Sequence, residues 1–294
     1  MKRFLAGALA AGVLLASIAA EAADTLRIAL QKTGTVAWEI DVLKARGLDK
    51  AADLDIQTTE LASTDAGKIA IQGGSADMIV SDWLWVQRER SLGGRLVFTP
   101  YSSALGAVMV RADAPIHAVA DLDGRSIGVA GGPLDKSWLL LQAAAKNGGL
   151  DLAARAKLAF GAPPLIAEKF AEGETDAALE FWNFCADLET RGFARAIDMI
   201  DIEKALGAKG PVAMTGYVFS EDFAATHRDA LKRFFGAVAK AREILASDPA
   251  AWDSIKARLK LKDDAALADI GGRALVGDAA TLDPATFYDP NGAP

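Results

Sequence analysis

Short apolar runs alternate with amphipathic segments along most of the chain. The first cycle comprises predicted strands at residues 26–30, 54–60 and 78–80 and predicted helices at 38–46 and 68–72. After Pro115 the cycle restarts, with a strand at 126–130 and a helix at 138–146. A further helix is predicted at 227–245 from apolar residues at helical spacing. Strands that alternate with helices are typical of α/β folds with mostly parallel sheets.

The restart is also a repeat of particular residues. Three residues recur 99 positions later with unchanged spacing: Gly74, Asp77 and Trp83 match Gly173, Asp176 and Trp182. Trp38 matches Trp138 at an offset of 100. Matches in the same order at a nearly constant offset predict two lobes that share one strand–helix–strand scheme. The period is too long for a solenoid, whose repeats span about 20–50 residues.

The repeat gives the expected domain organisation. We expect a signal peptide at 1–22, the first part of lobe 1 at 23–104, lobe 2 at 105–215, and a return to lobe 1 at 216–294 that ends in a loosely attached tail. The β-rich segments at 101–111 and 212–220 are expected to cross between the lobes as two hinge strands. Gly106 and Gly216 could absorb backbone change there.

The first residues predict export. Lys2 and Arg3 precede an apolar stretch, and Ala20-Glu21-Ala22 fits an A-x-A cleavage site, so we expect a cleaved chain in the periplasm. A retained membrane anchor is the alternative. The lone cysteine, Cys185, provides neither a lipobox nor an internal disulfide, and we expect it to be a small buried side chain. The net charge of −7 argues against a general nucleic-acid binder or a polybasic membrane-surface protein.

Candidate ligand contacts follow from the rule that ligands bind at the carboxyl ends of parallel strands. The rule selects loops in both predicted lobes, to which the crossing segment adds one tyrosine. The candidates are Gln31, Lys32, Thr33, Thr35, Trp38, Ser63, Thr64, Asp65, Ser81, Asp82, Trp83, Tyr101, Gly131, Gly132, Asp135, Lys136, Ser137, Trp138, Glu180, Trp182 and Asn183.

Tryptophans are concentrated in these loops. Five of the six lie in or beside them, and only Trp252 lies elsewhere. Indole rings that face each other across a cleft would suit a flat ligand, because aromatic rings stack. The alternative for Trp38 and Trp138, and to a lesser extent for Trp83 and Trp182, is packing in the core.

The loop at 131–137 predicts an anion site. It contains two glycines and leads into a helix, so backbone N–H groups, the helix dipole and Lys136 could all face a negative group. The alternative is an ordinary helix start, with Asp135 as the cap and Lys136 in solvent. Asp82 and Glu180 could accept hydrogen bonds from a ligand, or pair with lysines of the cleft.

Catalytic signals are weak in the sequence. The two histidines, His117 and His227, lie in polar contexts, and no Cys/His cluster offers metal ligands. Neither a Walker-type loop nor a dinucleotide-binding glycine motif follows a predicted strand. We therefore expect a protein that is not an enzyme and needs no cofactor or metal.

Three motifs link the chain to a known family. They are the helix–Gly–x–x–Asp step at 69–77, the segment Ala120-Asp121-Leu122-Asp123-Gly124-Arg125-Ser126-Ile127-Gly128-Val129, and Pro163-Pro164. With these motifs the chain resembles the substrate-binding proteins of nitrate, taurine and aliphatic-sulfonate ABC transporters, which include thiamine-pyrimidine binders. The resemblance covers essentially the whole mature chain.

The resemblance implies a two-lobed type II periplasmic-binding-protein fold, each lobe a mixed, mostly parallel sheet flanked by helices. It also implies a monomer that holds a small-molecule ligand between its lobes and delivers it to a membrane permease. The many tryptophans, with Asp82 and Glu180, depart from sulfonate binders and favour a flat, partly anionic heterocycle. A cationic or neutral aromatic ligand stays open.

Two alternatives to transport stay open, and the resemblance itself suggests the second. One is a periplasmic accessory protein that binds a cofactor, for example in a quinone-dependent dehydrogenase system. The other is a pyrimidine-synthase-like enzyme. That enzyme type depends on a cysteine-rich stretch and histidines, whereas this chain has one cysteine and two histidines.

Overall fold

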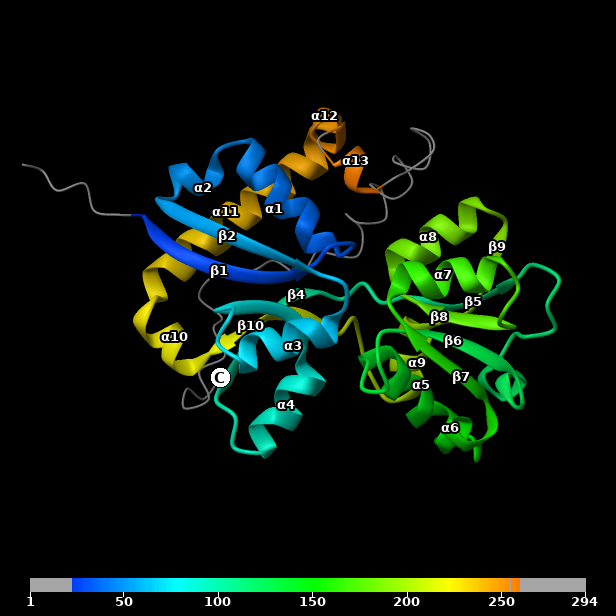
Figure 1. Cartoon of the computed structure of the whole chain (residues 1–294). Helices are drawn as coiled ribbons and strands as arrows, with labels where there is room; N and C mark the ends of the chain where they lie inside the picture. Colours follow the sequence, from blue (N-terminus) through cyan, green and yellow to red (C-terminus); the bar gives the residue numbers. More distant parts are fainter. Residues whose placement is uncertain (1–22, 254, 260–294) are drawn as a thin grey trace, which may run out of the picture.

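The chain forms two α/β lobes in a computed structural model that describes residues 23–253 and 255–259 (Figure 1). The predicted signal peptide at 1–22 and the predicted tail lie outside the described residues. The first sheet contains β1 (Asp24–Gln31), β2 (Leu54–Leu61), β3 (Met78–Asp82), β4 (Leu96–Ser102) and β10 (Thr215–Ser220). The second contains β5 (Ala107–Arg111), β6 (Ser126–Ala130), β7 (Lys157–Gly161), β8 (Ala177–Glu180) and β9 (Phe193–Asp198).

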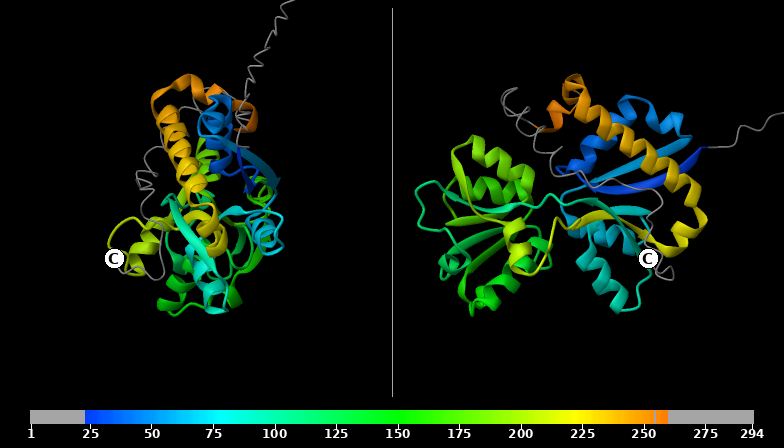
Figure 2. Two further views of the ribbon diagram at one scale, coloured as in Figure 1. Left: turned by 90° about the vertical axis from the view of Figure 1, so that its left-hand side faces the viewer. Right: turned by 180° about the vertical axis from the view of Figure 1, so that it is seen from behind.

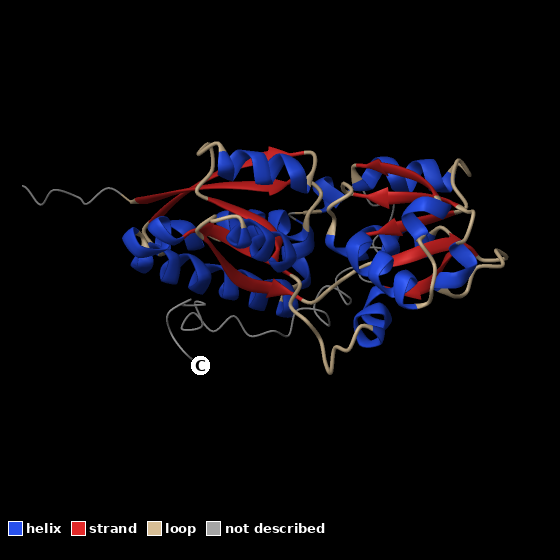
Figure 3. Ribbon diagram, turned by 90° about the horizontal axis from the view of Figure 1, so that it is seen from below, coloured by secondary structure: helices blue, strands red, loops and turns tan. Residues whose placement is uncertain are grey.

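Helices cover both faces of each sheet, as the view from below shows (Figure 3). The helices of the first lobe are α1 (Thr35–Ala45), α2 (Leu48–Ala51), α3 (Thr64–Gln72), α4 (Trp83–Ser91), α10 (Glu221–Thr226), α11 (Arg228–Ser247), α12 (Pro249–Asp253) and α13 (Lys256–Leu259). Those of the second are α5 (Lys136–Asn147), α6 (Leu152–Arg155), α7 (Pro163–Ala171), α8 (Trp182–Thr190) and α9 (Met199–Ala205), with a 3-10 turn at Val119–Leu122. None of these described helices combines the length and apolar character that crossing a membrane needs.

The two sheets have the same topology. Their strand orders are β2-β1-β3-β10-β4 and β7-β6-β8-β5-β9. In the first sheet β1 pairs in parallel with β2 and β3, and β10 is antiparallel to β3 and β4. In the second, β6 is parallel to β7 and β8, and β5 is antiparallel to β8 and β9. The expected mixed α/β lobes are therefore confirmed.

Two segments join the lobes, and both can be followed from behind in Figure 2. The chain leaves the first sheet after Ser102 and enters the second at Ala107; it returns from α9 to β10. The two glycines of these crossings have a packing role. A Cβ on Gly106 would lie 1.5 Å from the carbonyl oxygen of Glu180, and one on Gly216 would lie 2.4 Å from that of Thr99. Larger residues at either position would push neighbouring strands apart.

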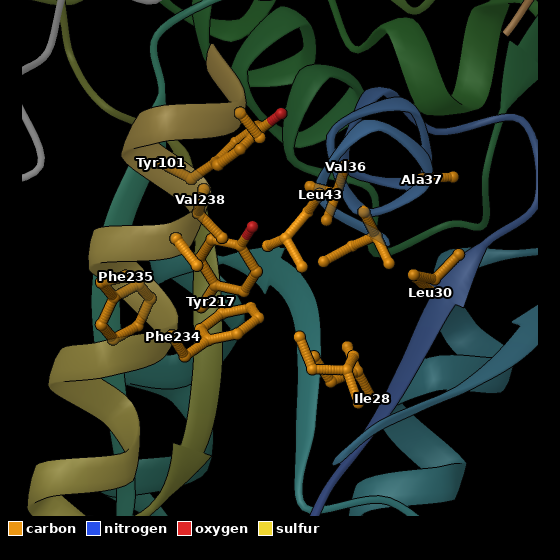
Figure 4. Close-up of a cluster of buried hydrophobic side chains, with 14 of the residues drawn as sticks. Ile28, Leu30, Val36, Ala37, Leu43, Tyr101, Tyr217, Phe234, Phe235 and Val238 are labelled. Atoms are coloured by element: carbon orange, nitrogen blue, oxygen red, sulfur yellow. The ribbon is translucent and has the colours of Figure 1, made fainter. Parts of the chain in front are cut away.

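Successive side chains of each strand point to opposite faces of the sheet, and the apolar ones form the cores. In β1, Leu26, Ile28 and Leu30 face α1 and α11, whereas Ala29 joins the cluster on the opposite face. Figure 4 shows this first cluster, in which the ring of Tyr217 meets aromatic rings of α11. Each fully buried aliphatic or aromatic side chain contributes roughly 1.5–3 kcal/mol, so these faces hold each sheet to its helices.

The sequence repeat has a structural cause. Asp77 Oδ2 accepts a hydrogen bond from the backbone N–H of Arg27 at 3.0 Å, and Asp176 Oδ2 accepts one from Ser126 at 2.8 Å. Each aspartate thus ties its strand to the parallel neighbour, β3 to β1 and β8 to β6. The glycine three positions earlier has a positive φ in both lobes, +70° and +85°. The repeated Gly–x–x–Asp step therefore encodes the scaffold.

Candidate functional site

A cavity lies between the lobes and contains about 910 Å³ of empty space, including open solvent. The first lobe contributes Ala29, Leu30, Gln31, Gly34, Thr35, Val36, Leu61, Ser63, Thr64, Gly67, Val80, Ser81, Asp82, Tyr101, Ser102 and Thr215. The crossing segment and the second lobe contribute Ala104, Leu105, Gly106, Asp135, Lys136, Phe181, Trp182 and Asn183. Most of these residues lie at the carboxyl ends of strands and at the starts of α1, α3, α5 and α8, and the others belong to the segments that cross between the lobes.

Side-chain caps position the starts of α3 and α5, and also that of α4, which begins directly after Asp82 of the cavity wall. Ser63 Oγ accepts from the backbone N–H of Ala66 at 3.2 Å at the start of α3. Asp82 Oδ1 accepts from Trp85 N–H at 2.8 Å to begin α4, and Asp135 Oδ1 accepts from Ser137 N–H at 2.9 Å to begin α5. Capping uses one oxygen of each carboxyl. Both aspartates therefore stand at the cavity wall, one from each lobe.

Lys136 brings a positive charge to the cavity. Its Nζ lies 4.6 Å from the centroid of the Phe181 ring and 3.8 Å from Asp135 Oδ2. The side chain is 13% exposed, so it does not extend into bulk solvent. Burial raises the pKa of Asp135, the nearby Lys136 opposes that rise, and the carboxyl of Asp82 adds to it.

A buried network holds the aromatic wall. The Tyr101 hydroxyl donates to Glu39 Oε1 at 2.9 Å and lies 3.3 Å from Thr35 Oγ1. Arg242 donates from Nε to the same Glu39 oxygen at 2.9 Å, and its guanidinium lies 4.2 Å from the Tyr101 ring centroid. Two residues of the cavity wall, Thr35 and Tyr101, are thereby fixed to α11.

The expectation that indoles face each other across the cleft with a ligand between them needs correction, since Trp38 and Trp182, which meet between the lobes, are in direct edge contact with ring centroids 6.0 Å apart. Trp38 and Trp138 are each 2% exposed and belong to the cores of separate lobes. Trp83 is 37% exposed, and its Nε1 donates to the sulfur of Met214 at 2.9 Å, outside the cavity wall. Among the tryptophans that the structure describes, only Trp182 lines the cavity. Packing at the head of a helix explains the positions of Trp38 and Trp138.

Seven further candidates do not line the cavity, mostly because they make structural contacts. Glu180 is fully buried, and burial raises its pKa well above its usual range. Ser137 is buried at the start of α5, and Gly131 donates its N–H to Gly161 at 2.8 Å. Asp65 pairs with Lys68 at 3.2 Å. The remaining three are Lys32, Thr33 and Gly132.

Three of these residues, Thr33, Asp65 and Gly132, nevertheless lie where the lobes meet. The carbonyl oxygen of Thr33, in the first lobe, accepts a hydrogen bond from Asn183 Nδ2 of the second at 3.2 Å. A Cβ on Gly132 would lie 2.4 Å from Asp65 Oδ2, which places the 131–137 loop against the start of α3. Both contacts cross the cleft.

Strand-end reasoning missed several residues of the wall. Ser102, Ala104, Leu105 and Thr215 belong to the crossing segments, which the rule does not select. Phe181 also lines the cavity, and its position beside Trp182 was the available signal. The wall is therefore less indole-rich and more aliphatic than the sequence suggested.

Candidate metal ligands and candidate nucleophiles are few in the described part of the chain. No group of three or more His, Cys, Asp or Glu side chains there could hold a metal ion. Cys185 is fully buried in the core, and burial raises its thiol pKa. His117 and His227 are not among the residues that line the cavity.

Comparison with known proteins is consistent with this architecture. The model of the family described as NMT1/THI5 like matches residues 42–251, well over half of the chain. No curated protein matches. Many solved structures match, and all those named here are 20% identical or less.

Three solved structures illustrate the similarity. The alkanesulfonate-binding protein SsuA from Xanthomonas axonopodis pv. citri, bound to MOPS, has a TM-score of 0.69 at 20% identity and covers 86% of this chain and 85% of its own. The periplasmic aliphatic sulphonate binding protein SsuA from Escherichia coli has 0.66 at 20% identity, covering 84% and 82%. A DszB mutant in complex with biphenyl-2-sulfinic acid has 0.50 at 17% identity, covering 87% of each chain.

These matches confirm the resemblance that the sequence motifs indicated. The matched region contains β3 and the whole second lobe, hence both Gly–x–x–Asp steps, and the solved neighbours reproduce the two-lobed architecture. The chain therefore belongs to the NMT1/THI5-like family and has the fold of the periplasmic binding proteins.

Proposed function

We propose that this protein is a periplasmic solute-binding protein of an ABC importer that holds a flat, partly anionic ligand between its lobes. The observation that carries the proposal is the position of Lys136, whose ammonium group faces the Phe181 ring at the cavity wall. An acidic group on the ligand would pair with this ammonium, and an aromatic part would lie against Phe181, Tyr101 or Trp182.

Solved neighbours support a ligand with an acidic group. The Xanthomonas protein is an alkanesulfonate-binding protein bound to MOPS, and the DszB mutant is in complex with an aromatic acid, biphenyl-2-sulfinic acid. In each case the bound molecule carries a sulfur acid group. For this chain, the aromatic residues beside Lys136 favour a flat acid over an aliphatic one.

Transport requires that ligand binding change the arrangement of the two lobes relative to each other. A ligand that contacts both walls stabilises the closed arrangement, and a permease would distinguish closed from open protein. We propose that the monomer binds in the periplasm, that residues 1–22 direct export, and that it delivers its ligand without turnover. The buried Cys185 supports binding over the pyrimidine-synthase-like alternative, because a thiol with a raised pKa is a poor nucleophile.

Titration of purified protein with aromatic acids tests the proposal, after native mass spectrometry has identified any co-purified ligand. Replacing Lys136 by Met should weaken binding at least tenfold, because a charge-assisted hydrogen bond is worth about 1.5–3 kcal/mol. Lys146→Met is the matched control, since Lys146 lies exposed on the same helix. Equal affinity for acids in wild type and Lys136→Met would refute the anionic ligand.

A further inference from the structure

Asp82 has an oxygen that its structural role does not use. Oδ1 caps α4 by accepting from Trp85 N–H, whereas Oδ2 accepts no hydrogen bond from any described residue. The residue is only 4% exposed and lines the cavity. A carboxylate oxygen that faces the cavity without a donor from the protein is a place where a bound ligand can gain affinity by donating.

The neighbouring residue of β3 supports the same inference. Ser81 is 2% exposed and lines the cavity, and its Oγ has no hydrogen-bond partner among the described residues. Buried hydroxyls are nearly always paired in folded proteins. Two adjacent polar side chains at the carboxyl end of one strand therefore lack partners that a ligand could supply.

The charges of the cavity wall show what kind of partner is missing. Of the described residues that line the cavity, three are charged: Asp82, Asp135 and Lys136. A ligand that is only anionic would satisfy the ammonium but would leave the carboxyl of Asp82 unpaired and opposed by a like charge. A ligand with an N–H or O–H edge beside its acid group would satisfy both.

We propose that Asp82 is a specificity-determining residue, which selects ligands that present a hydrogen-bond donor together with an acidic group. The inference rests on the proposed function, because Lys136 holds the acid in the same cavity. Ligands that carry only acceptors, such as sulfate, simple alkanesulfonates or benzoate, are rejected by this carboxyl. Flat acids with amino groups or ring N–H groups are accepted.

Matched pairs of flat acids test the proposal by calorimetric titration: para-aminobenzoate against benzoate, and orotate against its N,N′-dimethyl derivative. Wild-type protein should bind the donor-bearing member about tenfold more tightly, as expected for one additional charge-assisted hydrogen bond. Asp82→Asn should reduce that ratio to about two or less. Asparagine is as good a helix cap as aspartate, so the variant should keep its fold, which its melting temperature checks.

Asp151→Asn is the matched control. Asp151 caps α6, where its Oδ1 accepts from Ala154 N–H at 3.2 Å, and it does not line the cavity. The Asp151→Asn variant should show the same ratio of affinities for the two members of each acid pair as the wild-type protein. If flat acids bind but the ratio is near one, or if Asp82→Asn leaves it unchanged, the role of Asp82 is wrong while the proposed function stands. If no aromatic acid binds wild-type protein, the proposed function is wrong and the inference with it.

Discussion

Burial changes the acidity of the Glu203 side chain on α9. It is 5% exposed, and its Oε1 has no hydrogen-bond partner among the described residues. Burial, together with the nearby Asp198, raises its pKa from 4.5 to about 7. The folded protein therefore keeps a proton that the unfolded chain releases, and stability falls as the pH rises from about 4.5 to about 7, then stays level.

Glu203→Gln should remove this dependence. Its melting temperature relative to wild type should rise by a few degrees between about pH 5 and about pH 8, because only the wild type must bury a charge at the higher pH. Melting curves followed by circular dichroism at several pH values measure the difference. Parallel curves for the two proteins would show that Glu203 titrates normally in the fold.

Single residues also mark how far sequence reasoning reached in the site. Ser63, Asp82 and Asp135 could be predicted because each follows a predicted strand, and ligands bind at the carboxyl ends of parallel strands. The tryptophans led to a wrong prediction, because a tryptophan at the start of a helix can either line the cleft or pack in the core. Only the burial of Trp38 and Trp138 decides between these outcomes, and burial depends on contacts with residues far away in the chain.

At the scale of elements, a buried ion pair joins three parts of the first lobe. Glu39 on α1 and Arg242 on α11 have side chains that are 7% and 16% exposed, and both contact Tyr101 at the end of β4. Removing one member of such a pair leaves the other charge buried and unpaired. The pair therefore links the cavity wall to the C-terminal helices.

Arg242→Met should destabilise the protein by about 3 kcal/mol, the loss expected when one partner of a buried pair is removed. The double variant Glu39→Gln/Arg242→Met should recover part of this loss, because no charge is then left alone. Urea unfolding of wild type and the three variants measures the coupling. A double variant as unstable as the sum of the two single variants would contradict an energetic link between these helices.

The elements of the fold were largely predictable, but their arrangement was only partly so. The pattern of apolar residues along the chain predicts strands such as β6 and helices such as α11, and the sequence repeat predicts two similar lobes. The sequence did not predict that β5 and β10 insert antiparallel as the fourth strand of each sheet, between β8 and β9 and between β3 and β4. It depends on long-range pairing, in which each crossing strand enters next to β8 or β3, and local patterns do not report such partners.

At the scale of the whole molecule, each lobe places a residue in the hydrophobic packing of the other. Trp182 on α8 packs against the core of the first lobe, where its ring centroid lies 6.0 Å from that of Trp38. Leu84 on α4, the equivalent helix of the first lobe, packs against the core of the second. Figure 1 shows α8 on the side of its lobe that faces α1. The two equivalent helices thus hold the lobes together across the cleft.

These contacts should make closure favourable even without a ligand. If the indole of Trp182 leaves the first lobe when the lobes separate, its apolar surface is buried only in the closed state, and this burial stabilises the closed state relative to the open one. Trp182→Ala would then shift ligand-free protein towards the open state, and the radius of gyration from small-angle X-ray scattering should increase. A stability loss of about 2 kcal/mol should accompany this change, because the ring is only half-buried.

Phe160→Ala provides the control for this experiment. Phe160 packs on Trp138 at 6.0 Å within the second lobe, so its loss should lower stability but leave the radius of gyration unchanged. An unchanged radius in Trp182→Ala as well would mean that the indole contact persists through opening and belongs to the hinge. In that case the contacts left to distinguish closed from open protein would be the hydrogen bond from Asn183 to Thr33, the approach of Asp65 to Gly132 and the packing of Leu84 on the second lobe.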